Sequence, residues 1–104
     1  MAWVRAAAVA DVPNHSNRAV DVAGRRILIC RAPMGLFAVG SICSHQQQDL
    51  EGGKMKGCFL FCPLHGVRFD LRDGSPAGTL TDRPIATYPA RIDGDSIFVD
   101  LAFG

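Results

Sequence analysis

Glycine and proline interrupt this chain at short intervals, and this spacing limits what the chain can fold into. The 104 residues include 11 glycines and 6 prolines. Between them lie short runs rich in valine, isoleucine, leucine and phenylalanine, and no segment keeps a helical apolar period over three turns. Short apolar runs separated by turn signals are typical of an all-β sandwich or barrel. We therefore expect an all-β fold without a long helix.

The apolar runs predict nine strands, joined by turns that contain glycine, proline or aspartate. The predicted strands are Trp3–Ala8, Ala19–Val22, Arg26–Arg31, Leu36–Gly40, Gly57–Phe61, Val67–Asp70, Ile85–Tyr88, Ala90–Asp93 and Ser96–Asp100. The predicted turns are Ala23-Gly24, Pro33-Met34-Gly35, Asp73-Gly74 and Asp93-Gly94. Turns of this composition commonly close β-hairpins, so we expect mostly antiparallel pairing.

Length and charge exclude several classes of function. A chain of 104 residues suits one domain, which we place at residues 1–104. Eleven basic and ten acidic residues leave a net charge of +1, too little for a nucleic-acid-binding surface. No apolar run reaches the roughly 20 residues needed to cross a bilayer. The apolar run between Arg5 and Asp11 is also too short for a signal peptide. We expect a cytoplasmic bacterial protein without nucleic-acid or membrane partners.

Two short pairs of cysteine and histidine mark the middle of the chain. The first is Cys43-Ser44-His45 and the second is Cys62-Pro63-Leu64-His65, with sixteen residues between His45 and Cys62. Each pair is short enough for one loop to present two ligands to one centre. The four candidate metal ligands are Cys43, His45, Cys62 and His65. Two thiolates and two imidazoles can bind zinc tetrahedrally or hold an asymmetric 2Fe-2S cluster, so both remain open.

The composition of the chain changes around these pairs. From Ser41 to Asp82 it holds both pairs and many of the glycines, whereas the flanking segments contain plain predicted strands. This indicates a strand base, residues 1–40 and 83–104, with a site-bearing segment inserted at 41–82. Such a long insertion is expected to contain strands of its own.

The two pairs and their neighbours resemble the Rieske motif, C-x-H…C-P-x-H-G. The matching residues are Cys43-Ser44-His45 and Cys62-Pro63-Leu64-His65-Gly66. Leu50 and Gly53 occupy positions where Rieske ferredoxins commonly carry leucine and glycine. Residues 67–74 and 83–89 also look like the usual continuation of these ferredoxins, so the resemblance covers essentially the whole chain.

The resemblance implies a fold, a cofactor and a role. The fold is a six-stranded antiparallel base with a small cluster-binding subdomain, here residues 41–82. One Rieske 2Fe-2S cluster is implied, with the inner iron on Cys43 and Cys62 and the outer iron on His45 and His65. Members of this length are not enzymes. They carry single electrons from a flavin-dependent ferredoxin reductase to a ring-hydroxylating oxygenase in aromatic catabolism, and we expect both partners to dock near His45 and His65.

Four positions differ from the high-potential Rieske proteins of respiratory complexes. Those proteins carry a disulfide at the positions of Gln48 and Leu64, and hydroxyl donors at the positions of Val67 and Phe69. Valine and phenylalanine cannot donate to the cluster or its ligands from their side chains. Since fewer hydrogen bonds to sulfur stabilise the reduced cluster less, we expect a potential of roughly −150 mV, at the low end of the Rieske range.

The remaining cysteines, His15 and the glutamine run allow simpler readings, and two other functions fit the sequence. We expect Cys30 to be a buried core thiol, Cys58 to be structural on the strand that leads to Cys62, and His15 to lie in a polar surface turn. Gln46-Gln47-Gln48 is either a solvated loop or part of a contact surface. The alternative functions are a small subunit of an assimilatory nitrite reductase and a structural zinc-binding interaction module.

Overall fold

The computed structural model describes residues 2–43, 48–63, 67–78 and 81–102. In these ranges the chain forms strands and one short 3₁₀ turn, η1 (Val9–Asp11), and no α-helix. No helix in the described ranges is long and apolar enough to span a membrane. The strands are β1 (Trp3–Ala8), β2 (Ser16–Val22), β3 (Arg25–Ala32), β4 (Gly35–Gly40), β5 (Met55–Lys56), β6 (Phe59–Phe61), β7 (Arg68–Asp70), β8 (Pro76–Ala77), β9 (Thr87–Tyr88), β10 (Ala90–Asp93) and β11 (Ser96–Asp100).

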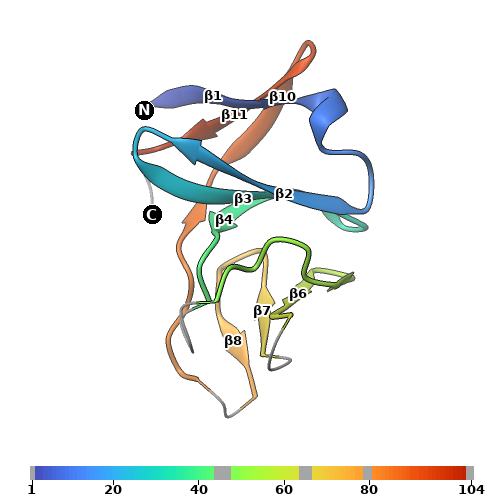
Figure 1. Ribbon diagram of the computed structural model, residues 1–104, viewed down its shortest axis with the longest axis vertical. Helices are drawn as coiled ribbons and strands as arrows, with labels where there is room; N and C mark the ends of the chain where they lie inside the picture. The colour runs from blue at the N-terminus through green and yellow to red at the C-terminus, as the bar shows by residue number, and fades with distance from the viewer. Residues whose placement is uncertain (1, 44–47, 64–66, 79–80, 103–104) are drawn as a thin grey trace.

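The strands form three antiparallel sheets, which confirms the all-β prediction. Their orders are β1-β11-β10, β2-β3-β4-β9 and β5-β6-β7-β8. Figure 1 shows them in succession along the long axis, with β1, β10 and β11 at one end and β6, β7 and β8 at the other. The third sheet thus lies at the end of the molecule farthest from β1, and it is built from the segment that follows the first cysteine–histidine pair.

Strand β3 lies between two hydrophobic cores. Successive side chains on a strand point to opposite faces. Ile27 and Ile29 accordingly pack in one core with β11, and Leu28 and Cys30 pack in the other core with the third sheet. All four side chains are completely buried. Burial on both faces explains why this strand is an unbroken apolar run rather than an alternating one.

Within the described residues the first two sheets contain seven strand segments, where the resemblance implied a base of six strands. The difference arises at Pro89, which separates β9 in one sheet from β10 in the other. Proline has no N–H to donate to a sheet ladder, so it is found where pairing changes or ends. Its carbonyl still accepts a hydrogen bond from the Asp100 N–H, at 3.0 Å. One stretch of chain therefore serves both sheets of the base.

The prediction of a single strand at Gly57–Phe61 was wrong. Gly57 and Cys58 instead form the turn of a hairpin between β5 and β6, in which Lys56 pairs with Phe59. Gly57 has a φ of +61°, a conformation that glycine adopts without strain. The two-residue strands β5 and β8 are too short to give a sequence pattern, and β8 contains Pro76, which only an edge position tolerates.

Candidate metal centre

Each of the two predicted ligand cysteines begins a loop that is closed by a backbone hydrogen bond. The N–H of Cys43 donates to the carbonyl oxygen of Gln48 at 2.7 Å, and the N–H of Cys62 donates to that of Val67, also at 2.7 Å. In both cases the acceptor lies five residues after the donor. The two loops are therefore closed in the same way, and each contains one cysteine–histidine pair. His45 and His65 themselves lie outside the described residues.

The structure brings Cys43 and Cys62 into the same buried cluster. Cys43 is completely buried and Cys62 is 3% exposed. Both belong to the core that lies between β3 and the third sheet. No disulfide joins the chain's four cysteines, all of which are described. Both thiols therefore line one core, and their role as ligands of one metal centre stays a prediction.

The surroundings of the two thiols fit a metal cluster. A thiolate buried among apolar side chains is costly unless a cation compensates its charge. The core around Cys43 and Cys62 is lined by aliphatic and aromatic side chains, so a bound iron would supply that compensation. No group of three or more metal-ligating side chains occurs within the described ranges. The histidines that would complete the donor set lie outside those ranges.

Val67 and Phe69 form part of the apolar wall around the cysteines. Val67 is 2% exposed and Phe69 is completely buried, and both belong to the same cluster as Cys43 and Cys62. At these two positions the wall offers carbon atoms rather than hydroxyl groups. The backbone carbonyl of Gln48 accepts the hydrogen bond from the Cys43 N–H that closes the first loop. Leu64 lies outside the described residues.

Asp49 ties the neck of the first loop to the base. Its Oδ1 accepts hydrogen bonds from Ser41 Oγ at 2.6 Å and from the Glu51 N–H at 2.9 Å. Its Oδ2 accepts one from Arg26 Nε of β3 at 2.7 Å. Partial burial acts to raise the pKa of Asp49, but the hydrogen bonds from Ser41, Glu51 and Arg26 outweigh it and lower the pKa. The carboxylate therefore stays ionised and links β3 to the loop.

Removing this carboxylate is expected to destabilise the protein and loosen the first loop. Asp49→Ala should lower the free energy of unfolding by about 1 to 2 kcal/mol, because three hydrogen bonds to one partly exposed carboxylate are lost. Asp21→Ala is the matched control, since Asp21 lies 3.9 Å from the same Arg26 and its side chain is 77% exposed. Urea unfolding of both variants measures the difference. Equal stabilities would contradict this role for Asp49.

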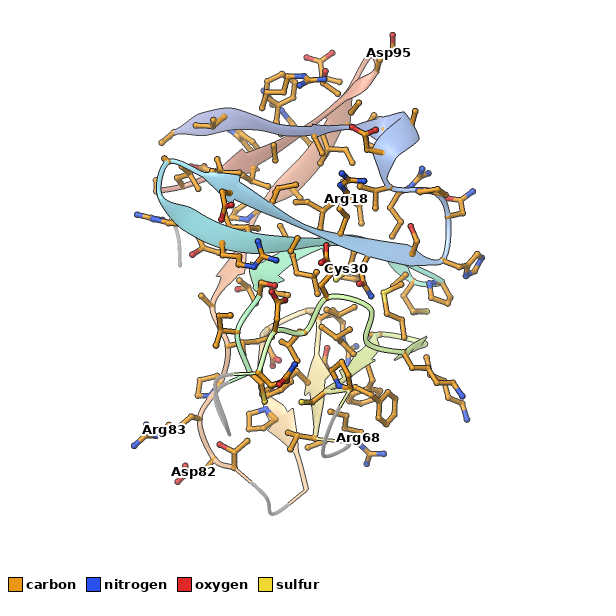
Figure 2. All side chains as sticks on the ribbon, viewed as in Figure 1. Arg18, Cys30, Arg68, Asp82, Arg83 and Asp95 are labelled. Atoms are coloured by element: carbon orange, nitrogen blue, oxygen red, sulfur yellow. The ribbon has the colours of Figure 1, made fainter. Side chains whose placement is uncertain are left out.

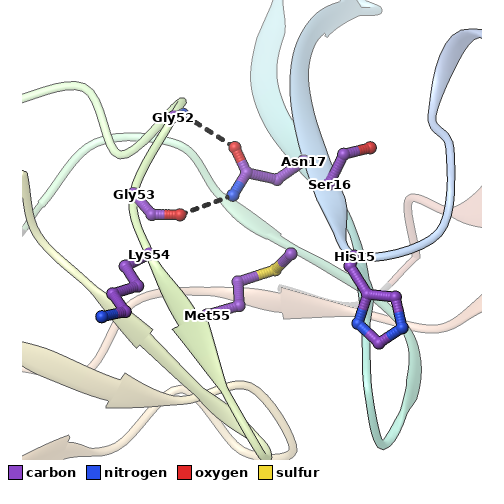
Figure 3. Close-up of a pocket in the computed structure, with 7 residues that line it drawn as sticks. All are labelled: His15, Ser16, Asn17, Gly52, Gly53, Lys54 and Met55. Atoms are coloured by element: carbon purple, nitrogen blue, oxygen red, sulfur yellow. Dashed lines mark hydrogen bonds between the residues drawn. The ribbon is translucent and has the colours of Figure 1, made fainter.

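A second anchor lies just after the first loop, where Asn17 of β2 holds Gly52 and Gly53. Asn17 Nδ2 donates to the Gly53 carbonyl at 2.9 Å, and the Gly52 N–H donates to Asn17 Oδ1 at 2.7 Å (Figure 3). A Cβ atom on Gly53 would lie 2.3 Å from the Phe61 carbonyl oxygen, so no larger residue fits there. This contact gives a physical reason for glycine at a position that the resemblance singled out.

The pocket drawn in Figure 3 lies beside this anchor. It is lined by His15, Ser16, Asn17, Gly52, Gly53, Lys54 and Met55. His15 is exposed, as predicted for a polar surface turn, and Lys54 is exposed as well. The polar atoms of Asn17 are already used in holding Gly52 and Gly53. The pocket is therefore the gap between β2 and residues 52–55, which Asn17 holds together.

The two remaining cysteines lie in different environments. Cys30 is completely buried on β3, as predicted, and burial raises the pKa of its thiol to about 12. Cys58 is only partly buried, in the turn between β5 and β6. Thiolates, not thiols, react with alkylating agents. In the native protein we expect iodoacetamide to modify Cys58 and to leave Cys30 unmodified, as checked by peptide mass spectrometry. Equal labelling of Cys30 would contradict the packing of β3.

Comparison with known proteins identifies the family. The family model described as "Rieske [2Fe-2S] domain" matches residues 2–89. The ferredoxin component of the naphthalene 1,2-dioxygenase system of Pseudomonas aeruginosa is 28% identical over 100 residues, covering 96% of both chains. The ferredoxin component of the p-cumate 2,3-dioxygenase system of Pseudomonas putida is 33% identical over 93 residues, covering 78% of this chain and 79% of the relative.

A solved structure agrees with the sequence matches. The ferredoxin of carbazole 1,9a-dioxygenase from Nocardioides aromaticivorans superimposes with a TM-score of 0.86 at 29% identity, covering 96% of this chain and 98% of that one. The family match selects one Rieske-type 2Fe-2S cluster as the cofactor and removes the support for a structural zinc site. Matched over most of its length by the family model and by this structure, the chain belongs to the Rieske [2Fe-2S] domain family.

Proposed function

We propose that this protein is a one-electron carrier that receives electrons from a flavin-dependent ferredoxin reductase and delivers them to a terminal ring-hydroxylating oxygenase. The observation that carries this proposal is the nearly complete, two-way coverage between this chain and proteins named as ferredoxin components of dioxygenase systems. In such a system the chain is an electron-transfer component and the oxygenase performs the chemistry.

The ligand set follows from the motif and from the burial of the cysteines. We infer that Cys43 and Cys62 hold one iron and that His45 and His65 hold the other. The cluster supplies a centre that accepts and returns one electron. Residues 41–82 would form the cluster-binding subdomain, and residues 1–40 and 83–104 the base. Support comes from the matching closure of the two loops and from the anchoring of the first loop by Asp49 and Asn17.

The surroundings of the cysteines support a low potential. Val67 and Phe69 fill positions where a hydroxyl would stabilise the reduced cluster, and both are buried against the core that holds Cys43 and Cys62. A low potential suits delivery of electrons to an oxygenase and does not suit oxidation of a quinol. A low potential therefore favours a role in an oxygenase system over a role in a respiratory complex.

The partners would dock at the histidine end of the two loops. Pro63, which follows Cys62, is exposed, and the motif places Leu64 and Gln47 in the same loops. We expect Leu64→Asp and Gln47→Glu to slow electron delivery while leaving the cluster in place, because each puts a charge on an uncharged contact surface. Unchanged turnover with the oxygenase would count against this surface.

Reconstitution with purified components tests the function. The reductase and oxygenase encoded beside this gene are mixed with NADH, the aromatic substrate and this protein in catalytic amounts. Product formation should depend on this protein and should saturate as its concentration rises. If product formation by the oxygenase does not depend on this protein, while nitrite reduction by a nitrite reductase large subunit does, the nitrite reductase alternative holds instead.

A further inference from the structure

The two cluster loops are positioned in different ways. The second loop begins at Cys62 and joins β6 to β7, which pair over three successive residues and are flanked by β5 and β8. The first loop begins at Cys43 and lies between β4 and β5, which belong to different sheets. Within the described ranges its two arms share one isolated bridge, between Ile42 and Asp49. A backbone ladder therefore positions Cys62, whereas the position of Cys43 depends more on contacts from side chains.

The Asp49 carboxylate joins both arms of the first loop to the base. Its Oδ1 accepts hydrogen bonds from Ser41 Oγ on the incoming arm, at 2.6 Å, and from the Glu51 N–H on the outgoing arm, at 2.9 Å. Its Oδ2 accepts one from Arg26 Nε of β3, at 2.7 Å. Ser41 is 1% exposed and lies two residues before Cys43. Because a buried hydroxyl keeps its hydrogen-bond partner, a displaced Asp49 carboxylate would move the chain that carries Cys43.

We propose that Asp49 is a positioning residue for the 2Fe-2S cluster, and that it acts through Ser41 and Arg26 to hold the Cys43 sulfur where the inner iron requires it. This inference rests on the ligand set of the proposed function. Cys43 is completely buried, so its sulfur reaches the iron only from the position that its backbone gives it. Contacts that orient metal ligands from outside commonly change metal affinity by about 10- to 100-fold.

Two variants that change the charge in opposite directions test the proposal. Asp49→Asn removes a negative charge and Arg26→Met removes a positive one, but both break the bond between these two side chains. The backbone bond from the Ser41 N–H to the Arg26 carbonyl oxygen should remain in both variants. Each holoprotein is placed in excess EDTA, and bleaching of its visible absorption measures loss of the cluster. Visible circular dichroism, recorded beforehand, reports the geometry of the ligands, and far-UV circular dichroism checks the fold.

Both variants should lose the cluster at least about tenfold faster than the wild type, because the same contact to the neck of the first loop is broken. Their visible circular dichroism should change in the same direction. The double variant Asp49→Asn/Arg26→Met should be no faster than the faster single variant, since both changes remove one bond. An effect of charge alone would instead act in opposite directions in the two single variants.

Asp70→Asn is the matched control on the second loop. Asp70 accepts hydrogen bonds from the N–H, Nε and Nη2 of Arg72 at 2.9, 3.0 and 2.7 Å, so this variant also breaks a carboxylate–guanidinium contact. Asp70 pairs with Phe59 at the end of the β6–β7 ladder away from the loop. Phe69 and Arg68, the latter labelled in Figure 2 at the end of the molecule far from Asp95, continue the ladder between Asp70 and the loop. The bleaching rate of Asp70→Asn should equal that of the wild type.

The outcomes separate a positioning role from a merely structural one and from the proposed function. Equal acceleration in Asp70→Asn would mean that general loss of stability releases the cluster, and opposite effects of Asp49→Asn and Arg26→Met would mean that charge does. Either result, or bleaching of both variants at the wild-type rate, would overturn the role of Asp49 and leave the proposed function standing. A wild-type protein that holds no 2Fe-2S cluster would instead overturn the proposed function and this inference with it.

Discussion

Replacing Cys62 with serine is expected to abolish stable binding of the 2Fe-2S cluster. In the proposed ligand set two thiolates hold the inner iron, and a serine hydroxyl neither ionises near neutral pH nor matches the softness of sulfur. Cys62 is 3% exposed, so no water-filled space is available to replace the lost ligand. The backbone hydrogen bond from residue 62 to Val67 does not involve the side chain and should persist. Iron and acid-labile sulfide analysis, with the visible spectrum, measures the loss.

Cys58→Ser and Cys30→Ala are the controls for this result. Cys58 lies in the turn between β5 and β6, and Cys30 lies on β3, so neither is carried on a cluster loop. Both variants should keep the full complement of two irons and two sulfides. Retention of the cluster by Cys62→Ser, or its loss from Cys58→Ser, would mean that the ligand set is assigned wrongly.

Introducing hydroxyl donors beside the cysteines is expected to raise the reduction potential. Phe69→Tyr and Val67→Ser each place a hydroxyl in the buried cluster that contains Cys43 and Cys62. A donor to a ligand sulfur or a cluster sulfide stabilises the reduced, more negative form. A gain of about 1.4 kcal/mol per donor corresponds to about 60 mV for one electron. Protein-film voltammetry of each variant gives the shift.

Phe61→Tyr provides the matched comparison for Phe69→Tyr. Phe61 lies on the outer side of the third sheet and Phe69 on the inner side, so the same hydroxyl is added away from the cluster. Its potential should remain within a few millivolts of the wild-type value. A downward shift in Phe69→Tyr, or an equal upward shift in Phe61→Tyr, would contradict the account of the low potential.

The sequence predicted the strands of the first sheet best. Trp3–Ala8, Ala90–Asp93 and Ser96–Asp100 were predicted with their observed bounds. The turn Asp93-Gly94 separates the last two of these strands. The third sheet was predicted less well, because β5 and β8 contain two residues each and are held by pairing with their neighbours rather than by any local preference. Strands of that length have too few residues to show a period.

The ligands of the candidate site remain a prediction from the sequence, whereas the side chains that anchor its loops were not predicted. The cysteine–histidine spacing indicated the centre directly, because ligands of one metal site must lie close together. The bonds of Asp49 to Arg26 and of Asn17 to Gly53 join residues that are distant in the sequence. Single charged or amide side chains carry no spacing signal, so these anchors become visible only when the strands are placed in space.

Protein-film voltammetry of the wild type tests the central claim most directly. A low-potential Rieske carrier should give one reversible one-electron couple at roughly −150 mV. This single result would show the cluster, its electron count and its potential together. A couple well above zero would contradict the low-potential assignment based on Val67 and Phe69, and a protein without any couple would contradict the electron carrier itself.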